Sequence, residues 1–197
     1  MKRFFGLLFL LALVLSMNSC KKGAEVADNP FFEDEWTTPY GVPPFDRIKM
    51  EHYVPAFERG MSLHNEQIEA IVSADEEPTF ENTILAYDNS GELLWRVATV
   101  FGMLSAADTD EQMQALSAEI YPAMAAHSDA ISMNEKLFER VKAVYDSRNS
   151  AGLGADEKRL TEKIYNDFVR SGALLSVAIF VVVICTVKRF QKYKKFI

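Results

Sequence analysis

Residues 46–71 read DRIKMEHYVPAFERGMSLHNEQIEAI, and their apolar side chains recur at the spacing of one helix face. These apolar positions are Tyr53, Phe57, Met61, Ile68 and Ile71. Because an α-helix returns to the same face every three or four residues, the pattern predicts a helix with one buried side. Pro55 lies inside this run, where its ring and its missing amide hydrogen predict a kink in the first turns.

The segments that follow predict further helices. Thr79 and Asn134 are typical N-cap residues, and the acidic run at 108–110 marks another helix start. The pair Ser90-Gly91 indicates a bend or a break in the helix that follows Thr79. The apolar residues expected on the buried faces are Ile84, Leu93, Leu94, Val97, Val100, Phe101, Leu104, Met113, Leu116, Ile120, Met124, Leu137, Phe138, Val141, Val144, Tyr145, Leu160, Ile164, Tyr165 and Phe168. No stretch alternates with period two for long enough to predict a strand, so the predicted fold class is all-α.

Charge is distributed unevenly along this chain of 197 residues, whose net charge is −7. All 28 acidic residues lie between Glu25 and Asp167, whereas seven of the 21 basic residues lie at the two ends. The 14 basic residues that remain in the body face 28 acidic ones, so the body carries a net charge of −14. A protein this acidic repels phosphate backbones, and the composition therefore argues against a nucleic-acid partner.

The first twenty residues have the form of an export signal. Lys2 and Arg3 give a positive start, an apolar run follows at 4–15, and Ser19 directly precedes Cys20. The run is too short to stay in a bilayer as a spanning helix. A small residue before a cysteine is typical of bacterial lipoprotein signals, so Cys20 is predicted to carry lipid on an exported protein, at the periplasmic face or in the cell envelope. The alternative is a plain secretory signal in which Cys20 is incidental.

These patterns divide the chain into four parts. Residues 1–20 are predicted to be the signal, and residues 21–44 a tether followed by an extended aromatic arm. Residues 45–173 are predicted to form a single helical domain, and residues 174–197 an apolar and then basic tail. The chain has only two cysteines, one near each end, so no disulfide framework is predicted for the body.

The histidines do not form a recognisable metal-binding pattern. The chain has three of them, His52, His64 and His127. A catalytic zinc site needs three protein ligands at one point, commonly with two of them one helical turn apart. No two of these histidines are four residues apart, and the helix signature His-Glu-x-x-His does not occur in the sequence. Each histidine is therefore predicted to be a surface or packing residue, and no metal or cofactor site is predicted in this chain.

The other residue types that could support catalysis are equally uninformative. No serine lies in a Gly-x-Ser-x-Gly turn, and no glycine-rich phosphate loop is present in the sequence. The acidic runs 75–77 and 108–110 adjoin predicted helix starts, where the helix dipole favours negative charge, so they are interpreted as structural. From the residues alone, no catalytic site is predicted.

Four segments of the body carry more specific information, because they occur in a defined order and at defined spacings. They are residues 43–61, 78–94 (PTFENTILAYDNSGELL), 134–145 (NEKLFERVKAVY) and 163–173 (KIYNDFVRSGA). Together they resemble the N-terminal helical region of the family that comprises peptidyl-dipeptidases (dipeptidyl carboxypeptidases), oligopeptidase A and thimet oligopeptidase. The resemblance covers residues 29–173, which is most of the chain after the signal.

This resemblance implies the N-terminal lobe of a larger, two-lobed helical zinc metallopeptidase that acts on short peptides. Peptidyl-dipeptidases release dipeptides from the carboxyl end of their substrates. In the family, the two histidines of His-Glu-x-x-His and a downstream glutamate hold zinc, and the motif glutamate polarises the attacking water. Those residues lie beyond the region that this chain resembles, so no residue here inherits their roles. The helices present would line one wall of the substrate channel.

The tail departs abruptly from the family pattern. Residues 171–197 contain no acidic residue, and basic residues gather at 188–195. One interpretation is a frameshift or truncated gene, in which the tail is out-of-frame translation. The other is a membrane anchor with its basic residues on the cytoplasmic side. As a helix, residues 173–187 would reach about 22 Å, short of a bilayer core of about 30 Å, which favours the first interpretation.

Two functional hypotheses follow from these observations. The first is an N-terminal fragment of an exported, lipid-anchored, peptidyl-dipeptidase-like protein that is inactive alone. The intact protein would bind short peptides, and the membrane through lipid on Cys20 or through the tail. The second hypothesis is a non-catalytic helical binding module that is tethered to the membrane and reuses the same domain.

Overall fold

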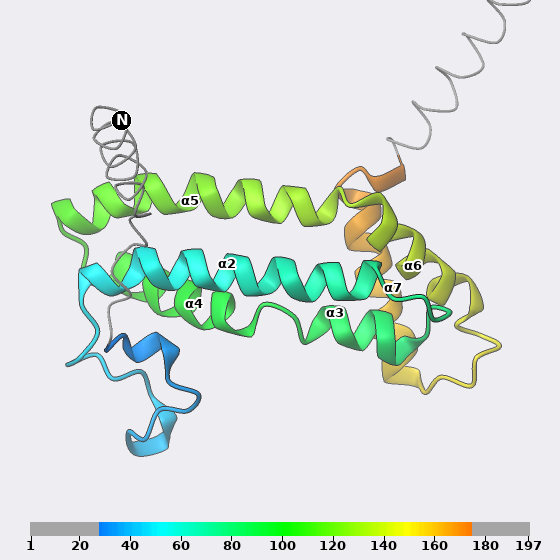
Figure 1. Ribbon diagram of the computed structural model, residues 1–197, viewed down its shortest axis with the longest axis horizontal. Helices are drawn as coiled ribbons and strands as arrows, with labels where there is room; N and C mark the ends of the chain where they lie inside the picture. The colour runs from blue at the N-terminus through cyan, green and yellow to red at the C-terminus, as the bar shows by residue number, and fades with distance from the viewer. Residues whose placement is uncertain (1–27, 175–197) are drawn as a thin grey trace, which may run out of the picture.

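Helix α2 (Met50–Val72) forms the spine of the structure (Figure 1). The structure is a computed structural model that describes residues 28–174. Every regular element within those residues is helical, which confirms the all-α prediction for the described part of the chain. Helix α2 continues through Pro55 as one element of 23 residues.

The other elements are helices or single helical turns of different lengths. They are η1 (Pro30–Phe32), η2 (Pro39–Gly41), η3 (Phe80–Leu85), α3 (Ala86–Asp88), α4 (Glu92–Ala107), α5 (Glu111–Ser132), α6 (Glu135–Ser147) and α7 (Ala155–Arg170). Elements η1 and η2 are single 3-10 turns, whereas η3 is a π-helical turn that leads directly into α3.

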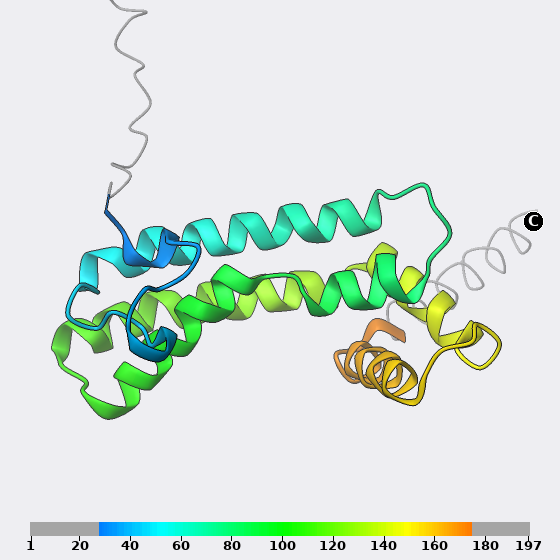
Figure 2. The same cartoon turned by 90° about the horizontal axis from the view of Figure 1, so that it is seen from below.

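Three long segments lie side by side along the length of the molecule: α2, α3 followed by α4, and α5 (Figure 1 and Figure 2). Helices α6 and α7 gather at the end where α2 finishes, and the chain that precedes α2 lies at the opposite end. The molecule is therefore an elongated bundle whose two ends are built from different parts of the sequence.

Side-chain caps fix several of the helix starts that the sequence predicts. Asp110 accepts a hydrogen bond from a backbone amide at the start of α5 (2.7 Å), and Asn134 does so for α6 (3.0 Å). Thr79 also accepts from the amide three residues later (3.2 Å). However, Thr79 caps the π-helical turn η3 and not the α-helix that the sequence predicts there. The caps were predictable, whereas the wider helical turn was not.

The predicted interruption at residues 90–91 is present. Helix α3 ends at Asp88 and α4 begins at Glu92. Between them Gly91 adopts a φ of 76°, in the left-handed region that glycine enters at no steric cost. A Cβ atom at Gly91 would lie 2.9 Å from Nδ1 of His64, so the glycine also makes room for that ring. The break thus seats the start of α4 against α2.

Buried apolar side chains form two clusters. The first, here the arm cluster, joins the chain before α2 to α2, α4 and α5, and contains Phe31, Tyr53, Ala56, Phe57, Leu94, Val97, Val100, Phe101, Met113 and Ile120. The second, here the α6–α7 cluster, contains Ile68, Ile71, Phe80, Ile84, Ile131, Leu137, Phe138, Val141, Val144, Ile164, Phe168 and Ala173. None of the apolar residues predicted for the buried helix faces is exposed in the structure. The two clusters occupy opposite ends of α2.

Some predictions concern residues outside the described part of the chain. They are the signal with lipid-modified Cys20 and the nature of the tail, and they stay predictions together with the four-part division. Within residues 28–174, no helix combines the length and the apolar character needed to span a bilayer.

Candidate functional site

A groove opens between α4 and α5 in the middle of the bundle, where the two apolar clusters give way to polar residues. It consists of two adjoining hollows of about 260 Å³ and 350 Å³. Both hollows are lined by His64, Tyr87, Trp95, Ser128 and Ser132. We refer to the two hollows together as the central groove. Its walls come from α3, α4 and α5, its base from α2, and one end from α7.

The smaller hollow is the apolar half of the central groove. Its apolar lining residues are Leu94 and Ala98 of α4 and Met124 and Ile131 of α5. Trp95 lies on the rim with 70% of its surface exposed, and its indole makes no ring contact with any other described residue. Large aromatic side chains are usually buried, so an open indole beside an apolar hollow marks a surface suited to a ligand.

The larger hollow is the polar half of the groove, and it carries charges of both signs. Asp88, Lys163 and Asp167 line it. Asp167 forms an ion pair with Arg170 at 3.3 Å, whereas the side chains of Asp88 and Lys163 form no hydrogen bond or ion pair with described residues. Burial raises the pKa of the Tyr87 hydroxyl, and the negative charges of Asp167 and Asp88 raise it further. Asp88 and Lys163 are therefore available to charges on a ligand.

Two histidines meet at the base of the groove. Nε2 of His127 lies 3.1 Å from Nδ1 of His64, and Nε2 of His64 lies 3.1 Å from Oγ of Ser90. The Ser90 hydroxyl donates its proton to the Tyr87 carbonyl oxygen at 2.6 Å, so it accepts from His64. The Nδ1 atom of His64 then carries no proton and accepts from His127. This chain of hydrogen bonds links α2, α5 and the break before α4.

Both imidazoles in this pair are held in the neutral form. Burial lowers the pKa of His64, and positive charge on His127 lowers it further. Burial also lowers the pKa of His127. An ordinary histidine titrates near pH 6.5, so a pKa below that value makes the neutral form of each ring predominate at pH 7. The base of the groove therefore offers a neutral, internally hydrogen-bonded surface.

The Ser90–His64 contact does not form a nucleophile with its general base. In such a pair the hydroxyl donates its proton to an imidazole nitrogen, and a third group orients the ring. Here the hydroxyl proton is committed to a backbone carbonyl, and the nitrogen that faces Ser90 is the donor. The arrangement positions two helices and holds no activated serine.

The contact between His64 and His127 could not be predicted from the sequence, in which each histidine stands alone. His52 does behave as a packing residue: it is buried, and its Nδ1 accepts a hydrogen bond from the Lys49 amide at 3.0 Å. His64 and His127 are also structural in their contacts, but they contact one another across 63 positions of sequence. A pairing over that distance leaves no local signal in a single sequence.

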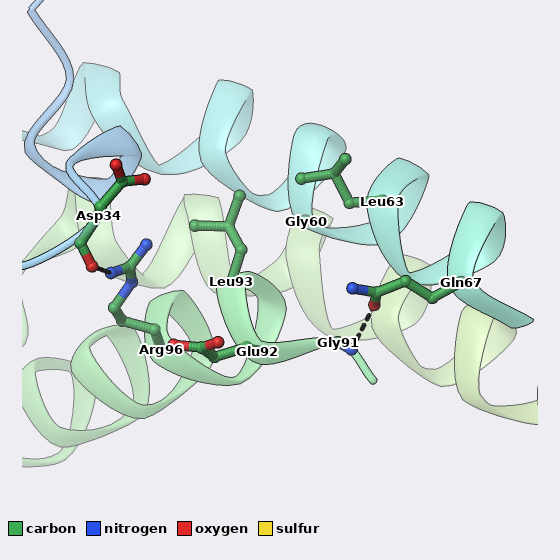
Figure 3. A pocket seen from close by; sticks show the side chains of 8 residues that line it. All are labelled: Asp34, Gly60, Leu63, Gln67, Gly91, Glu92, Leu93 and Arg96. Carbon is green, nitrogen blue, oxygen red and sulfur yellow. Dashed lines mark hydrogen bonds between the residues drawn. The ribbon is translucent and has the colours of Figure 1, made fainter. Parts of the chain in front are cut away.

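A third hollow, of about 320 Å³ and separate from the central groove, lies between α2, the start of α4 and the arm (Figure 3). Oε1 of Gln67 accepts the Gly91 amide proton at 2.7 Å, which satisfies a free amide at the helix start. The Arg96 guanidinium donates to the carbonyl oxygens of Asp34 and Phe31 at 3.1 and 2.9 Å. Gln67 and Arg96 thus bind other parts of the chain, and we interpret this hollow as a structural contact between α2, α4 and the arm.

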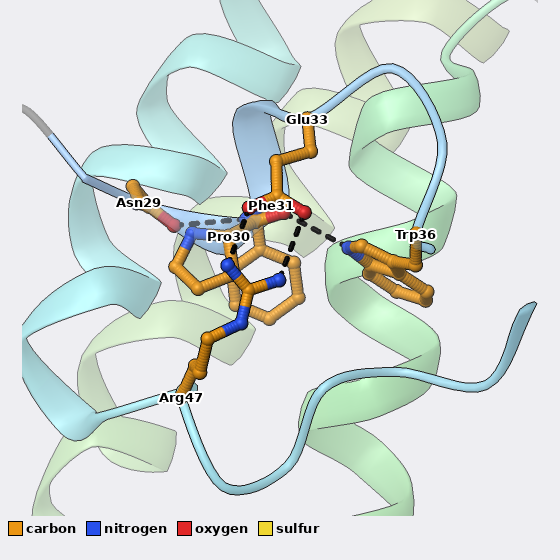
Figure 4. Close-up of polar contacts among 6 residues, drawn as sticks. All are labelled: Asn29, Pro30, Phe31, Glu33, Trp36 and Arg47. Atoms are coloured by element: carbon orange, nitrogen blue, oxygen red, sulfur yellow. Dashed lines mark hydrogen bonds and ion pairs between the residues drawn. The ribbon is translucent and has the colours of Figure 1, made fainter. Parts of the chain in front are cut away.

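The same contact continues into the arm that precedes α2 (Figure 4). The indole of Trp36 donates to the Pro30 carbonyl oxygen at 2.9 Å, and the side chain of Asn29 caps η1. Arg47 forms a two-pronged ion pair with Glu33, at 2.7 and 2.9 Å. These contacts fold the arm back on itself, and a hydrogen bond from the Asn29 side chain to the His52 carbonyl oxygen (2.9 Å) holds it against α2.

No cluster of three or more histidine, cysteine, aspartate or glutamate side chains that could hold a metal ion occurs within residues 28–174. The acidic runs at 75–77 and 108–110 adjoin helix starts, and Asp110 is the N-cap of α5. Their interpretation as structural agrees with this placement.

Comparison with known proteins identifies the relatives of the chain. No protein-family model matches it. However, it is 43% identical over 150 residues to dipeptidyl carboxypeptidase from Escherichia coli, and 42% identical over 151 residues to the protein of that name from Salmonella typhimurium. Over this region the chain resembles the dipeptidyl carboxypeptidases. Oligopeptidase A from Escherichia coli is a more distant relative, 24% identical over 135 residues.

The matched region makes up most of this chain but only a small part of each relative. It covers 76% of this chain but 22% of the Escherichia coli dipeptidyl carboxypeptidase, and 68% of this chain but 20% of oligopeptidase A. The chain therefore spans about a fifth of the length of the curated relatives that it matches. The family resemblance that the sequence predicts is confirmed for this partial region, and the relatives named here are peptidases.

Proposed function

We propose that this chain is a helical segment of a peptidase that releases dipeptides from the carboxyl end of short peptides, and that it has no catalytic activity alone. The observation that carries the proposal is 43% identity to a dipeptidyl carboxypeptidase of which only 22% is matched. The histidines and serine of the central groove support the second part, because their protons are committed to structural hydrogen bonds.

The proposal involves zinc only in the intact peptidase and not in this chain by itself. The family resemblance implies a zinc site built by a His-Glu-x-x-His helix, and the residues of this chain do not supply it. We propose that segments of the relatives beyond the matched region hold the metal and polarise the attacking water. The segment described here would form one wall of the space in which the peptide lies.

Activity of the isolated chain tests the first half of the proposal. The purified protein is incubated with amino-terminally blocked tripeptides and added zinc, and dipeptide release is measured with and without a chelator. We expect no release above background. Turnover that a chelator removes would contradict the proposal, because the chain would then contain a metal site of its own.

A chimera tests whether this segment is equivalent to that of its relative. The matched region of the Escherichia coli dipeptidyl carboxypeptidase is replaced by the corresponding residues of this chain. We expect the chimera to release dipeptides at a rate within about tenfold of the parent, a difference of about 1.4 kcal/mol in barrier. A chimera that folds and binds zinc like the parent but has lost dipeptide release would overturn the proposed equivalence.

We further propose that the protein is exported and held at a membrane by lipid on Cys20. The support is the positive start, the short apolar run and the small residue that precedes Cys20. Metabolic labelling with a fatty acid tests this proposal, with Cys20→Ser as the matched control. We expect label on the wild type and none on the variant. An unlabelled mature protein in the soluble fraction would contradict lipidation.

A further inference from the structure

We infer that the turn around η2 contacts a zwitterionic lipid surface, with Tyr40, Val42 and Phe45 as the side chains that meet the lipid. We refer to residues 38–45 as the arm tip. This contact is separate from the proposed peptidase activity and rests on one part of the proposed function, the lipid on Cys20.

The arm tip presents three large apolar side chains to solvent. Tyr40 is fully exposed, and Val42 and Phe45 are 47% and 48% exposed. In Figure 1 the light-blue turn that carries Tyr40 lies outside the helices, at the end of the bundle where α2 begins. A tyrosine combines an apolar ring with a polar hydroxyl, and such side chains are enriched where a membrane meets water. The arm tip is therefore suited to a boundary between lipid and water.

The backbone holds Tyr40 in this outward position. Its φ of 62° lies in the left-handed region, which a residue with a Cβ atom rarely enters. The Gly41 amide donates to the Thr38 carbonyl oxygen at 3.0 Å, and the Thr38 hydroxyl donates to the Val42 carbonyl oxygen. Three prolines within residues 39–44 restrict the chain further. An unfavourable backbone conformation that presents apolar surface to water indicates a functional role for this turn.

The charges beside the arm tip select the kind of lipid. Residues 36–45 contain no charged side chain, so their contact with lipid would take no charge out of water. The flanking residues 28–35 and 46–51 carry six acidic and two basic side chains, and one of the basic ones, Arg47, is already paired with Glu33. Anionic headgroups would be repelled by these acidic neighbours. The arm tip therefore fits a zwitterionic surface.

Lipid on Cys20 would bring the arm tip close to a membrane. Asp28, the first described residue, is eight positions after Cys20 in the sequence. A chain spans at most about 3.6 Å per residue, so Asp28 would lie within about 29 Å of the lipid-bearing cysteine. The Asn29 side chain donates to the His52 carbonyl oxygen at 2.9 Å and so fixes the start of the arm to α2. The arm and the bundle would thus approach the surface together.

Quenching of an indole by brominated lipid measures the contact directly. The full-length protein is purified with its lipid and placed in phosphatidylcholine vesicles, with or without bromine on the acyl chains. Tyr40→Trp is compared with Met133→Trp, an exposed position at the end of α5 remote from η2, both combined with Trp95→Phe. Trp95→Phe alone gives the contribution of Trp36. We expect bromine to reduce the fluorescence of Tyr40→Trp and to leave that of Met133→Trp unchanged.

Further variants test the apolar side chains and the charge. Val42→Ser/Phe45→Ser should reduce the quenching of Tyr40→Trp, although the lipid on Cys20 keeps the protein on the vesicles. Met103→Ser is the matched control, because this exposed apolar residue lies on α4, and it should leave the quenching unchanged. Replacement of part of the phosphatidylcholine by anionic phosphatidylglycerol should also reduce the quenching.

The outcomes distinguish this inference from the proposed lipid anchor. Quenching of Met133→Trp without quenching of Tyr40→Trp would overturn the inference, because the opposite end of the bundle would then face the lipid. Vesicle-bound protein with no quenching at either position would overturn it as well. Both results leave the anchor in place, since metabolic labelling tests Cys20 separately. An unlabelled Cys20, together with quenching of Tyr40→Trp by added vesicles, would overturn the anchor and support the arm tip.

Discussion

At the scale of single residues, the burial of His64 and His127 makes stability depend on pH. Burial lowers the pKa of both imidazoles below the ordinary value of 6.5. The unfolded chain therefore takes up protons near pH 6.5 that the folded chain does not, so the free energy of unfolding is largest above this pH and falls as the pH decreases through it. We expect urea unfolding to give a clearly lower stability at pH 5.5 than at pH 7.5.

Variants locate this pH dependence in the pair. In the double variant His64→Asn/His127→Asn, the difference in stability between pH 7.5 and pH 5.5 should shrink, whatever its absolute stability. Ser90→Ala keeps both imidazoles and is the matched control, so it should retain most of the pH dependence. An equal loss of stability on acidification in the wild type and the double variant would contradict the assignment.

A second prediction at this scale concerns Gly60 in α2. A Cβ atom at this position would lie 2.9 Å from the Cα of Leu94, which belongs to the backbone of α4 and cannot rotate away. Gly60→Ala should therefore destabilise the protein by about 1–3 kcal/mol, as overpacking does. Gly102→Ala is the control, because a Cβ there meets no atom within 4 Å and should stabilise α4 by about 0.5–1 kcal/mol. Urea unfolding measures the change in the free energy of unfolding for both variants. If Gly60→Ala left this free energy unchanged, α2 and α4 would be able to move apart at little cost.

Some features at the scale of single residues could be predicted from the sequence, and others could not. The break at Ser90-Gly91 was predictable, since a polar residue and a glycine interrupt a helical pattern locally. The close approach at Gly60 was not, because a glycine in a helix looks the same whether it faces solvent or another backbone. The His64–His127 pair was also hidden, since it forms only when α2 and α5 are brought together.

At the scale of elements, Arg140 of α6 ties together the loop and the π-helical turn that follow α2. Its guanidinium donates to the carbonyl oxygens of Ala74 and Glu76 at 3.0 and 3.1 Å, and to Oδ1 of Asn82 at 3.3 Å. The sequence predicted a helix start at Thr79 from its cap. It could not predict a π-helical turn, because the same cap precedes either type of helix and the partner that holds Asn82 comes from a distant helix.

Replacement of Arg140 tests this element. Arg140→Ala should lower the free energy of unfolding by about 1–3 kcal/mol, the range for hydrogen bonds from a charged group. It should also accelerate amide hydrogen exchange in η3 more than in α4. Arg159→Ala on α7 is the control, because this exposed arginine has no partner within residues 28–174, and it should change stability by less than about 0.5 kcal/mol. Unchanged exchange in η3 after Arg140→Ala would contradict the tie.

At the scale of the whole molecule, two apolar clusters hold the ends of the bundle and the central groove lies between them. The cluster membership was largely predictable, because helical periodicity shows which side chains face inward. The division into two clusters was not, since periodicity does not show which helices meet. The arm is the clearest case: its aromatic residues follow no helical period, yet Phe31 is fully buried among α2 and α4.

The arm therefore contributes to the stability of the whole bundle, and this gives the last prediction. Phe31 is 0% exposed, and its ring lies 5.4 Å from that of Tyr53. Phe31→Ala should destabilise the protein by about 3–5 kcal/mol, because it removes a fully buried aromatic ring. Phe45→Ala, at a position 48% exposed in the same stretch of chain, should cost less than about 1 kcal/mol. If urea unfolding gave equal, small losses for both variants, the arm would be an appendage and α2, α4 and α5 would hold the arm cluster together without it.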